Sequence, residues 1–264
     1  MMPPQRLLET TLIGAAAVLF AGANLRLPDR QPVVAPPPTT VATTDTMAAR
    51  DSAVSANPAS RALTAFASMV HSLSSPKALQ SAVKSYFAFK SAHPDEIKKP
   101  LLYFVDYGLP STQPRGYVLD MSSLKVVEGP FTVAHGRGSS TSQYGTPTRF
   151  SNSFGSAATS LGLYVTKALY AFTGHMAGQT YSSIGLRLQG VSTGFNDNAL
   201  ARGVVAHGAP YVTSAKAGRS QGCPAMEPSR AKELLPKLAD GAMVYLFAPD
   251  QNWMSRDPWL ATSN

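Results

Sequence analysis

Seven short, strand-like segments constrain this chain more than any other feature. Each is rich in β-branched or aromatic residues and is bounded by Gly, Pro, Ser or Asn, which is typical of short strands joined by tight turns. The segments are 101–107, 116–121, 125–136, 162–166, 184–190, 203–208 and 243–247. They predict a mainly β (α+β) domain over residues 96–250, a sandwich or barrel of mixed strands with packed helices.

Two helices are expected ahead of this domain, within residues 59–95. Apolar residues recur at helical spacing over 59–73. Ser75-Pro76 supplies a cap and a proline at the first helical position, so a second helix should begin there and end before Pro94. A further helix is expected from Pro228, and residues 251–264 form a C-terminal tail.

The N-terminus predicts export. Arg6 precedes an apolar run over residues 11–23 that ends in Ala-Gly-Ala, the small-residue pattern of a signal-peptidase site. The run is shorter than the roughly 18 residues of a spanning helix, so we expect a signal peptide at 1–23, no stable membrane span after cleavage, and a periplasmic location; an uncleaved anchor is the alternative. Residues 24–58 are rich in Pro, Ala and Thr and lack aromatics, which predicts a disordered, semi-stiff linker.

Charge and cysteine content narrow the partners. The formal net charge is +8, which suggests an anionic partner such as lipid headgroups or an acidic polymer, or only a solvated, mildly basic surface. The densest basic stretch is Lys98-Lys99, so we expect no nucleic acid. The single cysteine excludes a disulfide framework and a thiolate-built metal site within one chain. No His/Asp/Glu set has zinc-protease spacing, so we expect no metal, and we expect no cofactor. We expect the protein to be a monomer.

Residues 203–226 contain two competing nucleophile signatures. The first, Gly218 to Gly222, matches the G-x-S-x-G elbow of serine hydrolases. In that fold the catalytic histidine follows the serine, whereas all five histidines of this chain precede Ser220. The elbow interpretation is therefore rejected.

The second signature is Cys223, preceded by Gly222 and lying 16 residues after His207. A thiol with a pKa near ~8.5 needs a neighbouring base to react at neutral pH. A glycine before the cysteine leaves room for a substrate carbonyl and exposes backbone N–H groups as oxyanion donors. The Gly208 carbonyl could fix the imidazole tautomer. The alternative is a buried, inert cysteine, as most lone cysteines are.

At these residues the chain resembles a known family. The pattern H-G-x…S-x-G-C is similar to the active-site motif of the L,D-transpeptidases, and the longer context resembles the murein L,D-transpeptidase catalytic domain family, which cross-links peptidoglycan. The resemblance covers roughly residues 100–248. It is carried by VAHG at 133–136, FSNSFGS at 150–156, SLGLYVT at 160–166, LRLQG at 186–190, NDNALARGVVAHGAPYV at 196–212 and GRSQGCPAM at 218–226.

The resemblance implies roles for individual residues. Cys223 is the nucleophile, His207 the general base and Gly208 the source of the orienting carbonyl. The N–H groups of Gly222 and Cys223 form the oxyanion hole, and Ser220 shapes the loop.

This chain departs from the commoner branch directly after the nucleophile. Pro224-Ala225 stand where that branch has an aliphatic residue and an Arg thought to meet a substrate carboxylate. Another cation is then required, since guanidinium pairs with carboxylate in a bidentate fork. The candidate cations are Arg219, Arg202 and Arg187. Three further polar residues could bind substrate or hold the loops of the cleft: Gln221, His135 and Asn152.

The resemblance implies a cell-wall transferase acting on peptidoglycan stem peptides through a Cys thioester. The cross-link would join third positions, or start from the first, L-Ala position, and carbapenems would acylate the cysteine. An L,D-carboxypeptidase or stem-peptide hydrolase uses the same pair. A non-catalytic wall-binding domain is the alternative of another class.

Overall fold

A computed structural model describes residues 57–261 of the chain. The predicted signal peptide at 1–23 and all but the last two residues of the predicted linker lie outside the described residues. Within residues 57–261, no helix is long and apolar enough to cross a membrane.

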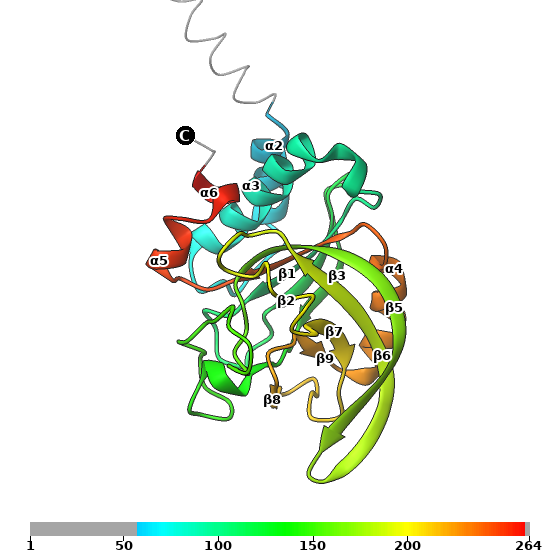
Figure 1. Ribbon diagram of the computed structural model, residues 1–264. Helices are drawn as coiled ribbons and strands as arrows, with labels where there is room; N and C mark the ends of the chain where they lie inside the picture. Colours follow the sequence, from blue (N-terminus) through cyan, green and yellow to red (C-terminus); the bar gives the residue numbers. More distant parts are fainter. Residues whose placement is uncertain (1–56, 262–264) are drawn as a thin grey trace, which may run out of the picture. The chain divides into compact units, whose positions relative to one another are not determined.

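The described part is built on one large mixed sheet (Figure 1). Its eight strands lie in the order β3-β2-β1-β10-β5-β6-β7-β9. The pairs β1–β10 and β7–β9 are parallel and the others antiparallel. The strands are β1 (Leu101–Asp106), β2 (Gly116–Asp120), β3 (Lys125–Phe131), β5 (Gly162–Met176), β6 (Gln179–Gly190), β7 (Val205–Gly208), β9 (Ala225–Met226) and β10 (Met243–Phe247).

The centre of the sheet follows from its apolar runs. Strands β1 and β10 pair in parallel from Leu102 opposite Met243 to Asp106 opposite Phe247. Every residue of β10, and all but the first of β1, is buried. Strands buried on both faces read as continuous rather than alternating apolar runs. The predicted fold class, mixed strands with packed helices, is confirmed.

Prolines and caps set the helix starts. Helix α2 (Pro58–Ala67) begins after Asn57, and α3 (Pro76–Ala92) after Ser75; in each case the cap side chain accepts a backbone N–H. Helix α3 ends before Pro94, as the sequence predicts, and the 3₁₀ turn η1 (Pro94–Glu96) follows. Helix α4 (Pro228–Leu238) packs on β6 and β7. Helix α2 is shorter than expected, since residues 68–73 leave the helix although Val70 remains buried.

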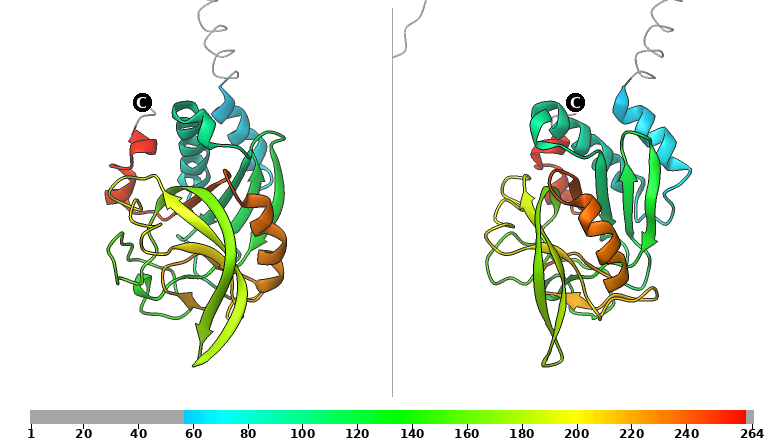
Figure 2. Two further views of the ribbon diagram at one scale, coloured as in Figure 1. Left: turned by 45° about the vertical axis from the view of Figure 1, so that its right-hand side comes forward. Right: turned by 90° about the vertical axis from the view of Figure 1, so that its right-hand side faces the viewer.

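Strands β5 and β6 form a hairpin much longer than the predicted segments 162–166 and 184–190. Their pairing runs out to Met176 opposite Gln179. Ala177 and Gly178 both have positive φ, the geometry of a two-residue hairpin turn that matches strand twist. The hairpin curves past the rest of the fold and ends in a free tip (Figure 2).

The predicted strand 125–136 is interrupted. Strand β3 ends at Phe131, and the short β4 (His135–Gly136) pairs in parallel with β8 (Arg219–Ser220) in a separate two-stranded sheet. The 3₁₀ turn η2 (Arg137–Ser139) follows β4 directly. This second sheet holds the segment that leads into Cys223.

The C-terminal segment packs onto the domain. Helices α5 (Gln251–Met254) and α6 (Pro258–Ala261) lie within it, and α6 contacts α3. The Trp259 ring meets Phe89 edge-on at 4.8 Å, and its Nε1 donates to the Val191 carbonyl at 2.7 Å. Described residues 251–261 are therefore part of the packed structure.

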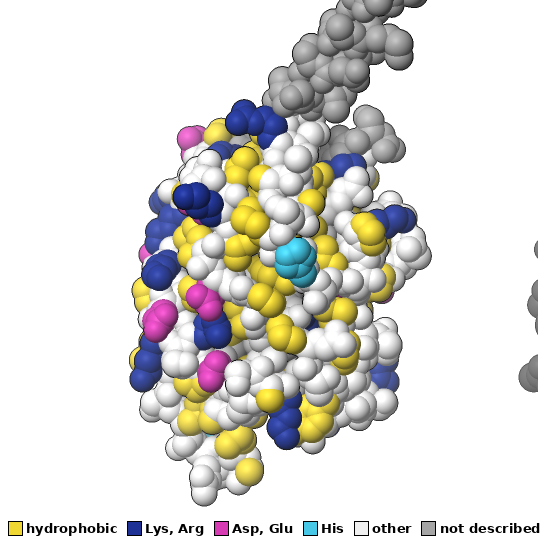
Figure 3. All heavy atoms as spheres, turned by 180° about the vertical axis from the view of Figure 1, so that it is seen from behind, with side chains coloured by type: hydrophobic (Ala, Val, Ile, Leu, Met, Phe, Trp, Pro, Cys, Tyr) yellow, Lys and Arg dark blue, Asp and Glu magenta, His cyan; other side chains and the backbone are white. Residues whose placement is uncertain are grey.

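The face opposite Figure 1 carries a gathering of hydrophobic side chains, with Lys and Arg interspersed with Asp and Glu along one edge (Figure 3). Helices α2 and α3 and their connection enclose an apolar hollow lined by Leu63, Ala67, Val70, Leu73, Pro76 and Leu79.

Candidate active site

Cys223 lies in the tight loop between β8 and β9. Ser220 Oγ accepts the Gly222 N–H at 3.1 Å and donates to the Cys223 carbonyl at 2.7 Å. One hydroxyl thus closes the loop from both sides, and Ser220 is almost fully buried. The serine that resembles a hydrolase nucleophile is therefore a loop-shaping residue.

Gly222 is required by the backbone. Its φ is +126°, a region that side chains disfavour, and a Cβ there would lie 2.9 Å from the Ala158 carbonyl oxygen. A Cβ on Gly136 of β4 would lie 2.8 Å from the Gly222 Cα. The cysteine loop is thus packed between β4 and the segment around Ala158 with no room for a side chain.

His207 is held in place by strand pairing, a hydrogen bond and a ring contact. It lies on β7, paired with Gly185 of β6 and Ala225 of β9. Its Nδ1 is 3.0 Å from the Gly208 carbonyl oxygen, so Nδ1 carries the proton and Nε2 keeps its lone pair. The Phe172 ring packs against the imidazole, with centroids 4.3 Å apart and the ring planes tilted by 31°.

Burial sets the charge state of both reactive groups. It lowers the pKa of His207 to about 4, against a smaller raising effect of the Gly208 carbonyl, so the imidazole is neutral at pH 7. Burial also raises the pKa of the Cys223 thiol, whereas the Val205 backbone hydrogen bond and the Arg202 charge lower it. The resting site therefore holds a thiol and a neutral base rather than an ion pair.

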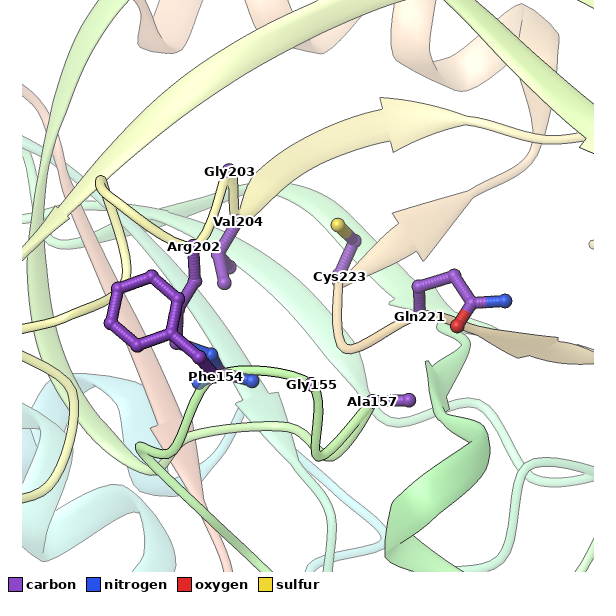
Figure 4. A pocket seen from close by; sticks show the side chains of 8 residues that line it. All are labelled: Phe154, Gly155, Ala157, Arg202, Gly203, Val204, Gln221 and Cys223. Atoms are coloured by element: carbon purple, nitrogen blue, oxygen red, sulfur yellow. The ribbon is translucent and has the colours of Figure 1, made fainter.

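Two cavities meet at Cys223, which is partly exposed. The first encloses about 230 Å³ and is lined by Phe154, Gly155, Ala157, Arg202, Gly203, Val204, Gln221 and Cys223. In Figure 4 the sulfur points toward the Gly203–Val204 side of this cavity.

The second cavity encloses about 320 Å³. It shares Gly203, Gln221 and Cys223 with the first, and its other lining residues are Phe172, Thr173, Gly174, His175, Tyr181, His207, Tyr211, Arg219 and Ser220. The thiol thus faces two separate spaces, of which one contains His207 and the other Arg202.

The Arg202 guanidinium forms four hydrogen bonds within the protein. Its Nη1 donates to the Ser151 carbonyl at 2.9 Å and to the Ser160 hydroxyl, and its Nη2 donates to the Ser156 hydroxyl at 3.2 Å and the Ala158 carbonyl at 2.9 Å. All four acceptors are neutral. The guanidinium clamps the 151–160 loop and leaves a net positive charge beside the thiol.

The other two predicted cations differ in position. Arg219 lines the second cavity, and its Nη1 donates to the Ser140 carbonyl at 2.9 Å. Arg187 lies outside both cavities, with its guanidinium 4.4 Å from the Tyr170 ring. Sequence reasoning missed Arg137, which is exposed and donates from Nε to Gln221 Oε1 at 2.8 Å. Its only signal was its position directly after the VAHG segment.

His135 and Asn152 line neither cavity at Cys223. Asn152 connects two loops: its Nδ2 donates to Asp197 at 2.5 Å, and its Oδ1 accepts the Asn198 N–H at 3.1 Å. His135 is fully buried on β4, and its Nδ1 accepts a hydrogen bond from Arg115 Nη2 at 3.0 Å. Burial, followed by the Arg115 charge, lowers its pKa to about 3.

Arg115 is a second residue that sequence reasoning missed. Its guanidinium is fully buried and donates to the carbonyls of Val133 and Leu109 as well as to His135. Burial lowers its pKa to about 10. An arginine directly before a predicted strand gave no sequence signal for this role, which holds β4 beneath the cysteine loop.

Within residues 57–261, no group of three or more His, Cys, Asp or Glu side chains is placed to hold a metal ion. The described site consists of a thiol, an imidazole, unpaired guanidinium groups and backbone N–H groups. Such a set can carry out acyl transfer through a covalent thioester.

The described fold thus places a thiol and an imidazole on the same cavity beside a mixed sheet. A family model described as the L,D-transpeptidase catalytic domain matches residues 71–247, about two thirds of the sequence. The chain belongs to this family, as the sequence motifs indicate. A comparison with curated proteins gave no match.

Solved structures of L,D-transpeptidases are similar at low identity. The enzyme from Mycobacterium smegmatis is 14% identical with a TM-score of 0.35, over 56% of this chain and 59% of its own. The one from Stackebrandtia nassauensis is 18% identical with a TM-score of 0.35, over 65% and 66%. That from Enterococcus faecium is 15% identical with a TM-score of 0.33, over 57% and 50%. The chain thus spans half to two thirds of the solved chains it matches, and likeness at these TM-scores carries no detail of the site.

Proposed function

We propose that this chain is a cysteine L,D-transpeptidase that cross-links peptidoglycan stem peptides in the periplasm. The observation that carries the proposal is the position of Cys223 at the junction of two cavities, with His207 lining one of them. A transferase needs room for a donor and an acceptor on either side of its nucleophile. Family membership supports the substrate class.

The mechanism begins with a neutral pair. Because the pKa of His207 is lowered to about 4, its Nε2 is unprotonated at neutral pH and can accept the thiol proton. The Cys223 sulfur then attacks a stem carbonyl carbon. As the C–N bond breaks, the imidazolium returns the proton to the departing amino group, which leaves a thioester.

The second half runs in reverse with a different amine. An amino group of a neighbouring stem attacks the thioester carbonyl and gives its proton to His207, and the sulfur leaves and is reprotonated. We assign the Cys223 N–H as a donor to the developing oxyanion. The Gly222 N–H is engaged with Ser220 Oγ and would have to exchange that bond for the oxyanion.

The donor position depends on where the substrate carboxylate binds. Four of the five N–H donors of Arg202 already bond neutral acceptors of the protein, so Arg219 in the second cavity is the better partner of a stem carboxylate. We assign the third-position carbonyl as the principal donor, with the first, L-Ala position as the alternative register. Acylation at either position uses Cys223 as nucleophile and His207 as general base.

The test is incubation of purified sacculi with the full-length protein, followed by mass analysis of the released muropeptides. Wild-type protein should generate new cross-linked dimers whose masses and fragments give the donor position. Cys223→Ser and His207→Ala should generate none, with unchanged thermal unfolding. Shortened stems without dimers would show that the protein is a hydrolase and not a transpeptidase. Binding to the wall without any change in muropeptide mass would show that it is a non-catalytic wall-binding domain.

A further inference from the structure

One wall of the second cavity is aromatic and uncharged. Phe172 and Tyr181 come from the β5–β6 hairpin and Tyr211 from the loop after β7; all three are partly exposed and line the cavity that reaches Cys223. The rings of Phe172 and Tyr181 lie 6.2 Å apart, and those of Tyr181 and Tyr211 lie 6.4 Å apart. We call these three residues the aromatic wall.

The hairpin fixes the position of the Tyr181 ring in this wall, which is tilted by 57° to the Phe172 ring and stands edge-on to the Tyr211 ring. Gly174 pairs with Tyr181 across the two strands, and a Cβ on Gly174 would lie 2.1 Å from Tyr181 Cζ. The tyrosine ring therefore covers the glycine of the opposite strand, where any other residue would push it away. Cross-strand aromatic–glycine pairs stabilise a strand that contains glycine. Here the pair also presents ring surface toward the cavity.

Charge is distributed unevenly around Cys223. The hairpin residues of the cavity, Phe172, Thr173, Gly174, His175 and Tyr181, include neither a carboxylate nor a Lys or Arg. The guanidinium groups of Arg219, Arg202 and Arg137 lie on the other elements around the cysteine loop, and none of the three forms a salt bridge within residues 57–261. A carboxylate-bearing ligand is drawn to that side, and a neutral ligand fits the aromatic wall.

The substrate of the proposed function contains both kinds of group. Its stem peptide carries carboxylates, while the strand to which each stem is attached is a polymer of N-acetylated amino sugars. A pyranose ring has an apolar face of C–H groups that packs on an aromatic ring and a rim of hydroxyls that bonds polar tips such as tyrosine O–H. The hairpin continues past the body of the fold to a free tip, which gives a long ligand room along it (Figure 2).

We propose that the aromatic wall of Phe172, Tyr181 and Tyr211 is a binding site for the amino-sugar backbone, a β-1,4-linked chain of N-acetylated hexosamines. This inference rests on the proposed function for its substrate class. The sugar strand lies along the β5–β6 hairpin, and the stem passes from it toward Cys223. The wall thereby selects stems that are still attached to their sugar.

The direct test is binding of chitotetraose, a neutral β-1,4-linked N-acetylglucosamine chain, to the full-length protein carrying Cys223→Ala. Titration calorimetry should detect binding, and Tyr181→Ala in the same background should weaken it at least about 10-fold. Tyr181→Leu, which keeps apolar volume without a flat ring, should weaken it similarly, and thermal unfolding of both variants verifies that they fold. The matched control is Phe154→Ala, which removes a 64% exposed aromatic residue from the first cavity and should leave chitotetraose affinity unchanged.

A kinetic comparison gives an independent readout. With Cys223 intact, kcat/KM is measured for a disaccharide tetrapeptide and for the sugar-free tetrapeptide. The ratio of the first value to the second should be lower in Tyr181→Ala than in the wild type. The inference is overturned if chitotetraose does not bind, or binds equally with and without the Tyr181 ring. Wild-type protein that cross-links stems without binding chitotetraose would refute the sugar site and leave the transpeptidase intact. Protein that binds chitotetraose but turns over no stem would refute the transpeptidase function and leave the sugar site intact.

Discussion

The buried imidazole of His135 makes the stability of this domain depend on pH. The ring is fully buried on β4, accepts a hydrogen bond from Arg115 at Nδ1, and has no partner for Nε2 within the described residues. Burial and the Arg115 charge hold its pKa at about 3 in the folded protein. We expect His135→Asn, whose amide oxygen can accept the same hydrogen bond, to remove this pH dependence.

The magnitude follows from proton linkage. In the unfolded chain a histidine titrates near ~6.5, so between pH 7 and pH 5 it takes up a proton that the folded state does not bind. Because the folded pKa is the lower one, stability falls as the pH drops through the unfolded value, and it continues to fall until the folded group protonates near its own pKa. From pH 7 to pH 5 this amounts to about 2 kcal/mol for one such residue.

Urea unfolding of wild type and His135→Asn at the two pH values measures the effect. The wild type should lose about 2 kcal/mol more than the variant on acidification, with equal m-values. The lowered pKa of His207 and the raised pKa of Asp106 are common to both proteins and cancel in the difference. His93→Asn, at a half-exposed position, is the control and should follow the wild type. Equal losses in wild type and His135→Asn would refute the argument that burial keeps this imidazole neutral.

The remaining predictions concern the cysteine loop and the N-terminal segment. A carbapenem should add its full mass to the wild-type chain and not to Cys223→Ala, as read by intact-mass measurement. Gly222→Ala should cost about 1–3 kcal/mol in urea unfolding and abolish turnover, because the φ of +126° disfavours a side chain and the Ala158 carbonyl oxygen is in its way; unchanged stability and turnover would contradict the loop geometry. Arg202→Met should shift the pH midpoint of Cys223 alkylation upward, since it removes a charge that lowers the thiol pKa, whereas Arg187→Met should not. Deleting residues 24–56 should leave processing of soluble muropeptides intact and impair only action on whole sacculi; loss of both activities would place the segment in the active site.

The parts of the fold that the sequence predicts are those with strong local signals. Continuous apolar runs predict the central strands β1 and β10, and a proline after a helix boundary predicts the starts of α3 and α4. The motif predicts that Cys223 and His207 lie close together, and both side chains line one cavity. In each case the information lies within a few residues of the feature.

The parts that the sequence does not predict depend on long-range contacts. Residues 167–183 alternate imperfectly and contain glycines, so the outer half of the β5–β6 hairpin is specified by cross-strand pairs such as Tyr181 over Gly174 rather than by local propensity. The burial of Arg115 depends on carbonyls of Leu109 and Val133. Arg202, a candidate for binding substrate, is held by acceptors about 40 to 50 residues away in sequence.

The packing around position 225 explains why this chain carries Ala there rather than Arg. Ala225 is fully buried, pairs with His207 on β7 and bridges to Ala134. It packs in a cluster of small side chains with Ala209, Val212 and Ala217. A guanidinium at position 225 would be forced into this apolar cluster without a partner, at a desolvation cost of several kcal/mol. Ala225 therefore serves the packing beside His207. Under the proposed function, the cation that meets a substrate carboxylate is then Arg219 of β8, which lines the cavity.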